Sequence, residues 1–232
     1  MGFSAVIILA QIVTAVPVGV AFGVAVYVTQ PESVAQATLG TLATNGLFLS
    51  LTVLVTTPPC VGLTFLFAWL RRRQIPVRRY LGLGAASARR TAVWLGATVL
   101  FAGAATALAL VVPDPIASNF MVKVYETSVF PPLMVVAFVV AAPLFEELLF
   151  RGFLFEGIRR SRLGAAGAVL VSSAAWAVIH FQYGWISIAL LLALGFLLSA
   201  ARLRTGSVWV CFLMHAVFNL IAVVETMVAA HA

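Results

Sequence analysis

Long apolar runs recur along the whole chain, and they limit its fold more than any other feature. Polar or turn-rich breaks separate seven of these runs, at roughly 4–28, 45–70, 91–112, 132–157, 165–182, 185–201 and 206–229. A membrane-crossing helix needs about 20 apolar residues, and a soluble domain would be about one-quarter charged. This chain is 63% hydrophobic and 9% charged, with a mean hydropathy of +1.11. We therefore predict an all-α, polytopic transmembrane helical bundle of about seven to eight spans, forming a single integral membrane domain over residues 1–232.

The first run is interpreted as a span and not as a cleaved signal. Residues 1–28 lack the basic n-region of a secretory signal and are too long for its apolar core.

Prolines mark two irregular places. The second run contains TTPPC at 56–60, where we expect a kink or a break because proline removes a helical hydrogen bond. The stretch 113–131 contains Pro113, Pro115 and Pro131, so we predict a loop there with an interfacial turn.

Basic residues gather in alternate loops of the predicted bundle. Twelve of the fourteen follow the second, fourth and sixth spans: Arg71, Arg72, Arg73, Arg78, Arg79, Arg89, Arg90, Arg159, Arg160, Arg162, Arg202 and Arg204. The opposite loops hold Lys123 together with Glu32, Asp114 and Glu126. The positive-inside rule therefore places the N-terminus and the basic loops in the cytoplasm and the C-terminus outside. The net charge of +7 indicates membrane topology and contact with anionic lipid, so we expect the bilayer, and no nucleic acid, as a partner.

One run carries three charged residues where charge is costly. The stretch PLFEELLFRGFL, residues 143–154, contains Glu146, Glu147 and Arg151. Ionisable residues within a span normally face the interior of the bundle and mark functional sites. The sequence therefore places a polar site inside the membrane.

Helical spacing gives the two glutamates different roles. Glu147 and Arg151 are four residues apart, so they lie on one face of the helix and can pair. Glu146 lies about 100° around the helix from Glu147 and about 140° from Arg151. We therefore predict Glu146 as the general base, because this arginine neutralises it less, and Glu147 with Arg151 as an orienting pair. The alternative for that pair is a bridge that only holds helices together.

Two further runs carry polar residues at helical spacing. WAVIHF, residues 176–181, places Trp176 and His180 on one face, and HAVFN, residues 215–219, does the same for His215 and Asn219. Alone, the first pattern also fits an interfacial histidine, and the second fits an interhelical hydrogen bond.

Depth in the membrane tests whether these residues can meet. Counting about 1.5 Å per residue, Glu146 lies about 19 Å beyond Arg159 and His215 about 17 Å beyond Arg204. His180 would lie about 27 Å beyond Arg162, which is too far, unless residues 163–167 belong mostly to the loop, which reduces the distance to about 20 Å. With that loop, the three residues share a layer near mid-membrane.

Three motifs resemble those of a known family. EELLFR followed by Gly152 resembles the EExxxR motif of the CAAX-protease and bacteriocin-processing (CPBP, Abi-type) intramembrane endopeptidases. SSAAWAVIH at 172–180 is similar to the second motif, FxxxH, and GSVWVCFLMHAVFN at 206–219 to the third. The motifs lie in family order within residues 143–219. The one departure is Trp176 where phenylalanine is usual, and we expect it to change the shape of the pocket more than its chemistry.

The resemblance implies a membrane endopeptidase with six matching site residues: Glu146, Glu147, Arg151, His180, His215 and Asn219. In the favoured arrangement, Glu146 activates a water with help from His180, while His215 and Asn219 stabilise the oxyanion. In the other, His180 and His215 with a glutamate hold zinc, although HExxH is missing and asparagine is a poor zinc ligand.

Two other functions stay open alongside the protease. Intramembrane Glu, His and Arg residues also build transporters, although the inverted repeats typical of many transporters are not evident. A family member can also be a bacteriocin-immunity or scaffolding protein that binds without cleaving.

The expected substrate of the protease is a membrane-associated protein or peptide, CAAX-like or otherwise lipophilic. The Ala-, Val- and Arg-rich composition is typical of bacteria, where prenylated CAAX proteins are not expected. The small-residue stretch GVAFG at 19–23 fits helix packing either within the bundle or between copies, so the oligomeric state stays open.

Overall fold

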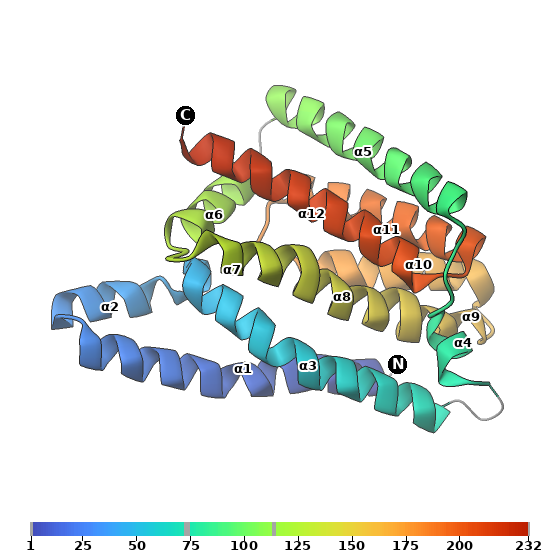
Figure 1. Cartoon of the computed structure of the whole chain (residues 1–232), viewed down its shortest axis with the longest axis horizontal. Helices are drawn as coiled ribbons and strands as arrows, with labels where there is room; N and C mark the ends of the chain where they lie inside the picture. The colour runs from blue at the N-terminus through green and yellow to red at the C-terminus, as the bar shows by residue number, and fades with distance from the viewer. Residues whose placement is uncertain (1, 72–74, 113–114, 232) are drawn as a thin grey trace.

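The computed structural model describes residues 2–71, 75–112 and 115–231 of the protein, and within these ranges it contains helices and no strand. The first half consists of α1 (Gly2–Thr29), α2 (Glu32–Gly40), η1 (Leu42–Thr44), α3 (Gly46–Arg71), α4 (Val77–Leu81), α5 (Ala88–Val111) and α6 (Pro115–Glu126). The second half consists of α7 (Pro131–Val135), η2 (Val136–Ala141), α8 (Ala142–Glu147), η3 (Leu148–Leu154), α9 (Phe155–Arg159), α10 (Gly164–Val178), α11 (Trp185–Thr205) and α12 (Val208–Ala230). The long helices run side by side along one axis, with α7 and α8 between α3 and α12 (Figure 1).

The predicted all-α membrane bundle is confirmed. Six described helical stretches are long and apolar enough to cross a membrane: Phe3–Thr29, Gly46–Arg71, Ala88–Val111, Pro131–Arg159, Trp185–Thr205 and Val208–Ala230. The span predicted at 165–182 is shorter, because α10 has 15 residues and ends at Val178. At about 1.5 Å per residue, α10 extends about 22 Å, less than the hydrocarbon thickness of about 30 Å.

Prolines interrupt the helices less than expected. Helix α3 continues through Pro58 and Pro59, so the alternative of a break at TTPPC is wrong; transmembrane helices tolerate proline when neighbouring groups satisfy the freed backbone groups. The predicted loop at 113–131 instead contains α6. Pro115 is compatible with this helix because the first helical position needs no N–H donor, while residues 113 and 114 lie outside the described ranges.

The basic residues gather at one end of the bundle. The described basic loop residues lie at the C-terminal ends of α3, α9 and α11, at the start of α5 and in the short helix α4. They are Arg71, Arg78, Arg79, Arg89, Arg90, Arg159, Arg160, Arg162, Arg202 and Arg204. Arg72 and Arg73 lie outside the described residues. In Figure 1, α4 and α9 mark this basic end, at the right, and α2, α6 and the C-terminus lie at the opposite end.

We call the stretch from α7 to α9 the central helix, and its α-helical geometry is interrupted twice. It contains two π-helical segments, η2 and η3, on either side of α8. Such wide turns are frequent at functional sites. Because α8 ends at Glu147, both glutamates lie between the two π-helical segments.

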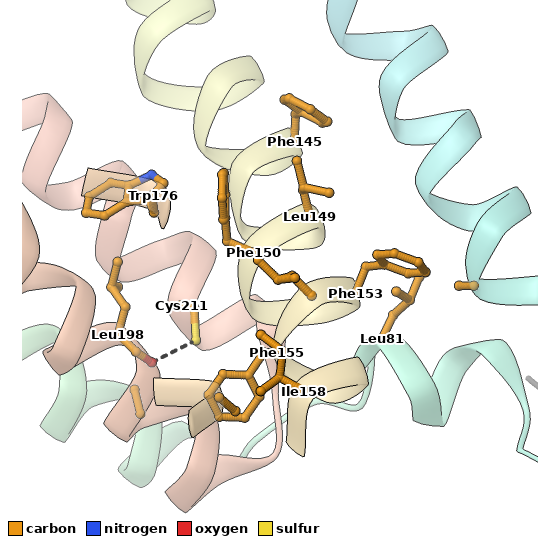
Figure 2. Packing of buried hydrophobic residues seen from close by; sticks show 14 of the residues in the cluster. Leu81, Phe145, Leu149, Phe150, Phe153, Phe155, Ile158, Trp176, Leu198 and Cys211 are labelled. Atoms are coloured by element: carbon orange, nitrogen blue, oxygen red, sulfur yellow. Dashed lines mark hydrogen bonds between the residues drawn. The ribbon is translucent and has the colours of Figure 1, made fainter. Parts of the chain in front are cut away.

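A dense apolar core fills the bundle around η3 toward the basic end. Phe150, Phe155 and Leu198 are almost completely buried there, and Cys211 Sγ donates to the carbonyl of Leu198 at 3.3 Å. Figure 2 shows these side chains packed around the central helix, with Trp176 at the edge of the cluster. The core therefore supports one side of the polar site.

Small residues bring α10 close to α11. A Cβ on Gly195 would lie 2.9 Å from Cβ of Ser173, and the hydroxyls of Ser173 and Ser199 are 3.1 Å apart. Small side chains allow such close approach between membrane helices. This packing holds α10, and with it Trp176, against the bundle.

Candidate active site

A cavity of about 360 Å³ collects most of the predicted site residues. Of the six, Glu146, His180, His215 and Asn219 line it, while Glu147 and Arg151 do not. The other lining residues are mostly apolar: Leu49, Val53, Phe120, Met121, Phe138, Ala142, Trp176, Gln182, Tyr183, Ser187, Leu190, Leu191, Phe218, Ala222 and Val223. The structure thus separates four cavity residues from a pair behind them.

The predicted ion pair is present and fully buried. Arg151 Nη1 lies 2.9 Å from Glu147 Oε1, and neither side chain has exposed surface. The same oxygen also accepts from Nδ1 of His215 at 2.9 Å. Glu147 therefore joins the central helix to α12 and orients His215, a contact that spacing within one helix does not reveal.

Trp176 contacts two charged residues of the central helix, Glu146 and Arg151. Its Nε1–H donates to Glu146 Oε2 at 2.6 Å. The Arg151 guanidinium lies 4.6 Å from the centre of its ring, a cation–π arrangement. Two guanidinium nitrogens of Arg151, Nε and Nη2, are buried without a hydrogen-bond partner among the described residues, so the indole face is the surface against which this charge packs. Trp176 thus holds the candidate base directly, a contact that the expected effect on pocket shape did not include.

The two histidines bond to protein groups through the same ring nitrogen, Nδ1. His180 Nδ1 lies 2.9 Å from the carbonyl oxygen of Trp176, which only accepts, so Nδ1 carries the proton. His215 Nδ1 likewise donates to the Glu147 carboxylate. In both neutral rings Nε2 is then an acceptor, and it donates only when the ring is an imidazolium. Both rings lie 5.1 Å, centre to centre, from the Trp176 ring.

His180 reaches this layer by a different route from the one predicted. Residues 164–167 belong to α10, so the loop at 163–167 that the depth estimate required is not present. The helix ends at Val178 instead, and His180 lies in the following turn, bonded back to the carbonyl of Trp176. The depth of His180 is therefore set by the end of α10 at Val178 and not by a later start of the helix.

Asn219 is held by the irregular backbone of the central helix. Its Nδ2 donates to the carbonyl of Phe138 at 2.8 Å, and Phe138 lies in the π-helical segment η2. One amide hydrogen of Asn219 is used in this bond, which leaves the second for a ligand in the cavity.

Tyr183 is a cavity residue that the sequence analysis missed. It lies between α10 and α11, its hydroxyl donates to Met121 Sδ at 3.5 Å, and its ring stacks near His180 at 6.1 Å. The pKa of Tyr183 is raised to about 12, mainly by burial. A hydrogen bond with Gln182 partly offsets this rise, and the nearby charge of Glu146 adds to it. No spacing pattern or matched motif singles out this tyrosine, so its role depends on the tertiary structure.

The zinc arrangement does not fit these side chains. Within the described ranges, no three His, Cys, Asp or Glu side chains are close enough to hold a metal ion. Nδ1 of His180, Nδ1 of His215 and Oε2 of Glu146 are bonded to protein groups, so the open atoms are Nε2 of each histidine and Oε1 of Glu146. These groups suit acid–base chemistry.

Fold and cavity together define a multi-pass helical membrane protein with an acid–histidine site enclosed among its spans. The family comparison identifies it further. Residues 128–221 match the family described as type II CAAX prenyl endopeptidase Rce1-like, and this segment contains all six predicted site residues. This match covers less than half of the chain; it confirms the resemblance seen in the motifs and supports an intramembrane protease in general. No curated protein and no solved structure matches the chain.

Proposed function

We propose that the protein is an intramembrane endopeptidase that hydrolyses a peptide bond of a membrane-associated protein or peptide, CAAX-like or otherwise lipophilic. One observation carries the proposal: Glu146, a carboxylate that forms no ion pair with any residue the structure describes, lines an apolar cavity with His180, His215 and Asn219. The compensated carboxylate, Glu147, is paired with Arg151 outside that cavity.

In the proposed reaction, Glu146 acts as the general base. Its Oε2 is held by Trp176, so Oε1 takes a proton from a water while the water oxygen attacks the carbonyl carbon of the substrate. The same carboxyl group then gives the proton to the leaving amine, as general acid–base catalysis requires. Nε2 of His180 is an acceptor in the neutral ring and orients the attacking water.

The negative charge that develops on the carbonyl oxygen is met by two donors. Asn219 supplies its second Nδ2 hydrogen, and His215 supplies Nε2–H as an imidazolium backed by Glu147. Preorganised donors of this kind contribute about 3–4 kcal/mol each to the transition state.

The proposed setting is a bacterial cell membrane, crossed several times. Basic residues at one end of the bundle support a cytoplasmic N-terminus and cytoplasmic basic loops. The composition of the chain supports a bacterial source, and there the substrate is a lipophilic membrane protein and not a prenylated one.

The test compares a Glu146→Gln variant with the unmodified protein. Cleavage of a membrane-anchored reporter and the abundance of membrane peptides in a strain carrying each form are measured. We expect Glu146→Gln to abolish cleavage and to cause a defined set of peptides to accumulate. Glu32→Gln on the exposed helix α2 is the matched control and should act like the unmodified protein. Full cleavage by Glu146→Gln, or a cellular phenotype that survives this change, contradicts the proposal and favours a binding or immunity role.

A further inference from the structure

The cavity lies toward the end of the bundle opposite the basic loops. On α3, it is lined by Leu49 and Val53, near Gly46, the start of the helix, whereas Arg71 ends it at the basic side. On α12, it is lined from His215 toward Val223, away from the basic start of the helix. The cavity therefore extends from the middle of the bundle to the end opposite the arginines.

The outer part of the cavity is formed by segments at that opposite face. Phe120 and Met121 come from α6, and Gln182 and Tyr183 come from the turn between α10 and α11. In Figure 1, α6 lies at the end away from α4 and α9. Gln182 is exposed, so it marks the mouth.

On the basic side, buried side chains of the described residues close the cavity. The buried Glu147–Arg151 pair lies behind the cavity, and the aromatic core around η3 follows it (Figure 2). Arg202 is also buried there, and its Nε donates to the carbonyl of Arg151 at 3.0 Å. Tight packing of this kind leaves no path for a polypeptide.

A second cavity continues the first along α12. It also measures about 360 Å³ and shares five lining residues with the first: Met121, Ser187, Leu190, Phe218 and Ala222. It extends to Glu225, whose carboxylate accepts from the hydroxyl of Thr106 on α5. Ten residues, or about 15 Å along the helix, separate His215 from Glu225.

The two cavities define the chemistry of an occupant. Their walls are mostly apolar, which suits an apolar polypeptide segment. Glu225 is exposed and forms no ion pair with any described residue. An occupant that carries a basic residue about 15 Å from the scissile bond complements this charge.

We propose that substrate reaches Glu146 from the membrane face opposite the basic loops, as an apolar polypeptide segment with a basic residue that lies beside Glu225. By the positive-inside rule this is the non-cytoplasmic face, so the substrates expose their cleavage site outside the cytoplasm. The inference rests on the proposed function, and it differs from a CAAX-type role, in which the substrate is a cytoplasmic chain end.

The first experiment measures the side of access without requiring activity. Gln182→Cys at the mouth and Ser161→Cys at the basic end are treated with a membrane-impermeant maleimide, in intact and in permeabilised cells. Both native cysteines, Cys60 and Cys211, are buried, so the unmodified chain gives the background. We expect Gln182→Cys to react in intact cells and Ser161→Cys only after permeabilisation.

The reverse labelling pattern, or reaction of both variants from one side, overturns the proposal. Where one of these variants is not produced, Lys123→Cys on α6 and Leu163→Cys at the basic end, both exposed positions, give the same comparison.

The second experiment measures cleavage. Single-span reporters carry the same apolar cleavage segment near either the outer or the inner membrane face. Lysine or leucine is placed about five residues from the cleavage site, which is about 15 Å in an extended segment, or about ten residues from it, which is about 15 Å in a helix. We expect cleavage only of the outer-face reporter, with the lysine form cleaved about tenfold faster, and with Glu225→Gln removing that preference. Cleavage of the inner-face reporter, or a lysine preference that survives Glu225→Gln, overturns the proposal. Absence of all cleavage contradicts the proposed function instead, while the labelling result still decides the side of access.

Discussion

The indole Nε1–H of Trp176 lies 2.6 Å from Oε2 of Glu146 and donates a hydrogen bond to it. A phenylalanine, usual at this position in the resembling family, has no donor to offer. In this protein the residue that forms the aromatic wall therefore also holds the candidate base.

Replacing Trp176 with phenylalanine should lower the rate of cleavage. A hydrogen bond to a charged group contributes about 1.5–3 kcal/mol, so kcat should fall about tenfold or more if the bond positions Glu146. Trp209→Phe is the matched control, because its Nε1–H donates to the carbonyl of Leu83, far from the cavity. Unchanged kcat in a folded Trp176→Phe protein would show that the indole bond is dispensable.

The two adjacent glutamates should differ in their effect on stability. Glu147→Leu leaves Arg151 buried without its partner, and breaking a buried pair costs about 3–5 kcal/mol. Glu146→Leu removes a half-buried carboxylate that has no ion pair, so its thermal unfolding temperature in detergent should change little. The double variant Glu147→Leu/Arg151→Met should recover much of the loss. Equal unfolding temperatures for the two single variants would contradict the assigned roles.

The pH dependence of cleavage should not come from Tyr183. Because burial raises its pKa to about 12, the phenol stays protonated from pH 5 to pH 9. A Tyr183→Phe variant should therefore show an altered KM or kcat without a shift of either midpoint in the pH–rate profile. A moved alkaline midpoint in that variant would indicate that the phenol ionises in the working range.

Gly82 should be required for stability at the basic end. It has a φ of +72°, and an added Cβ would lie 2.3 Å from Nη2 of Arg202, the residue that donates to the carbonyl of Arg151. The left-handed conformation alone costs about 1–2 kcal/mol for a residue with a side chain, so Gly82→Ala should lower the unfolding temperature. Gly84→Ala is the control, since its Cβ would meet no atom within 4 Å. Similar unfolding temperatures for both variants would contradict this role.

Removal of metal ions should leave activity intact. The cavity side chains form an acid–base site and no group of three metal-binding side chains in the described part of the chain. Purified protein should therefore contain less than one equivalent of zinc and keep its full cleavage rate after chelation. Loss of activity on chelation, with recovery on adding zinc back, would contradict the proposed chemistry.

Local spacing was a good guide to the polar residues. The i,i+4 relation between Glu147 and Arg151 predicted their contact correctly, because both lie on one helix whose geometry is known in advance. The placement of Glu146 apart from that pair also agrees with its position in the cavity. Contacts between helices could not be read in the same way, as Glu147–His215 and Trp176–Glu146 show.

The errors also have a common physical cause. The break expected at Pro58 and Pro59 and the loop expected before Pro131 followed local proline rules. The structure is helical at both places, because proline is tolerated within a membrane helix and at the first position of a helix. The depth of His180 was likewise decided by where α10 ends and by its bond back to Trp176.

The sequence by itself determined that this chain is a helical membrane protein, because the lengths of its apolar runs and the alternation of its basic loops follow from the thickness and polarity of a bilayer. It also predicted the candidate site residues, since charged residues persist in a span only at a cost. Only the tertiary structure decided which of them share a cavity, that Trp176 holds Glu146, and toward which face that cavity lies. These relations depend on how separate helices pack, and side-chain spacing within one helix carries no information about its neighbours.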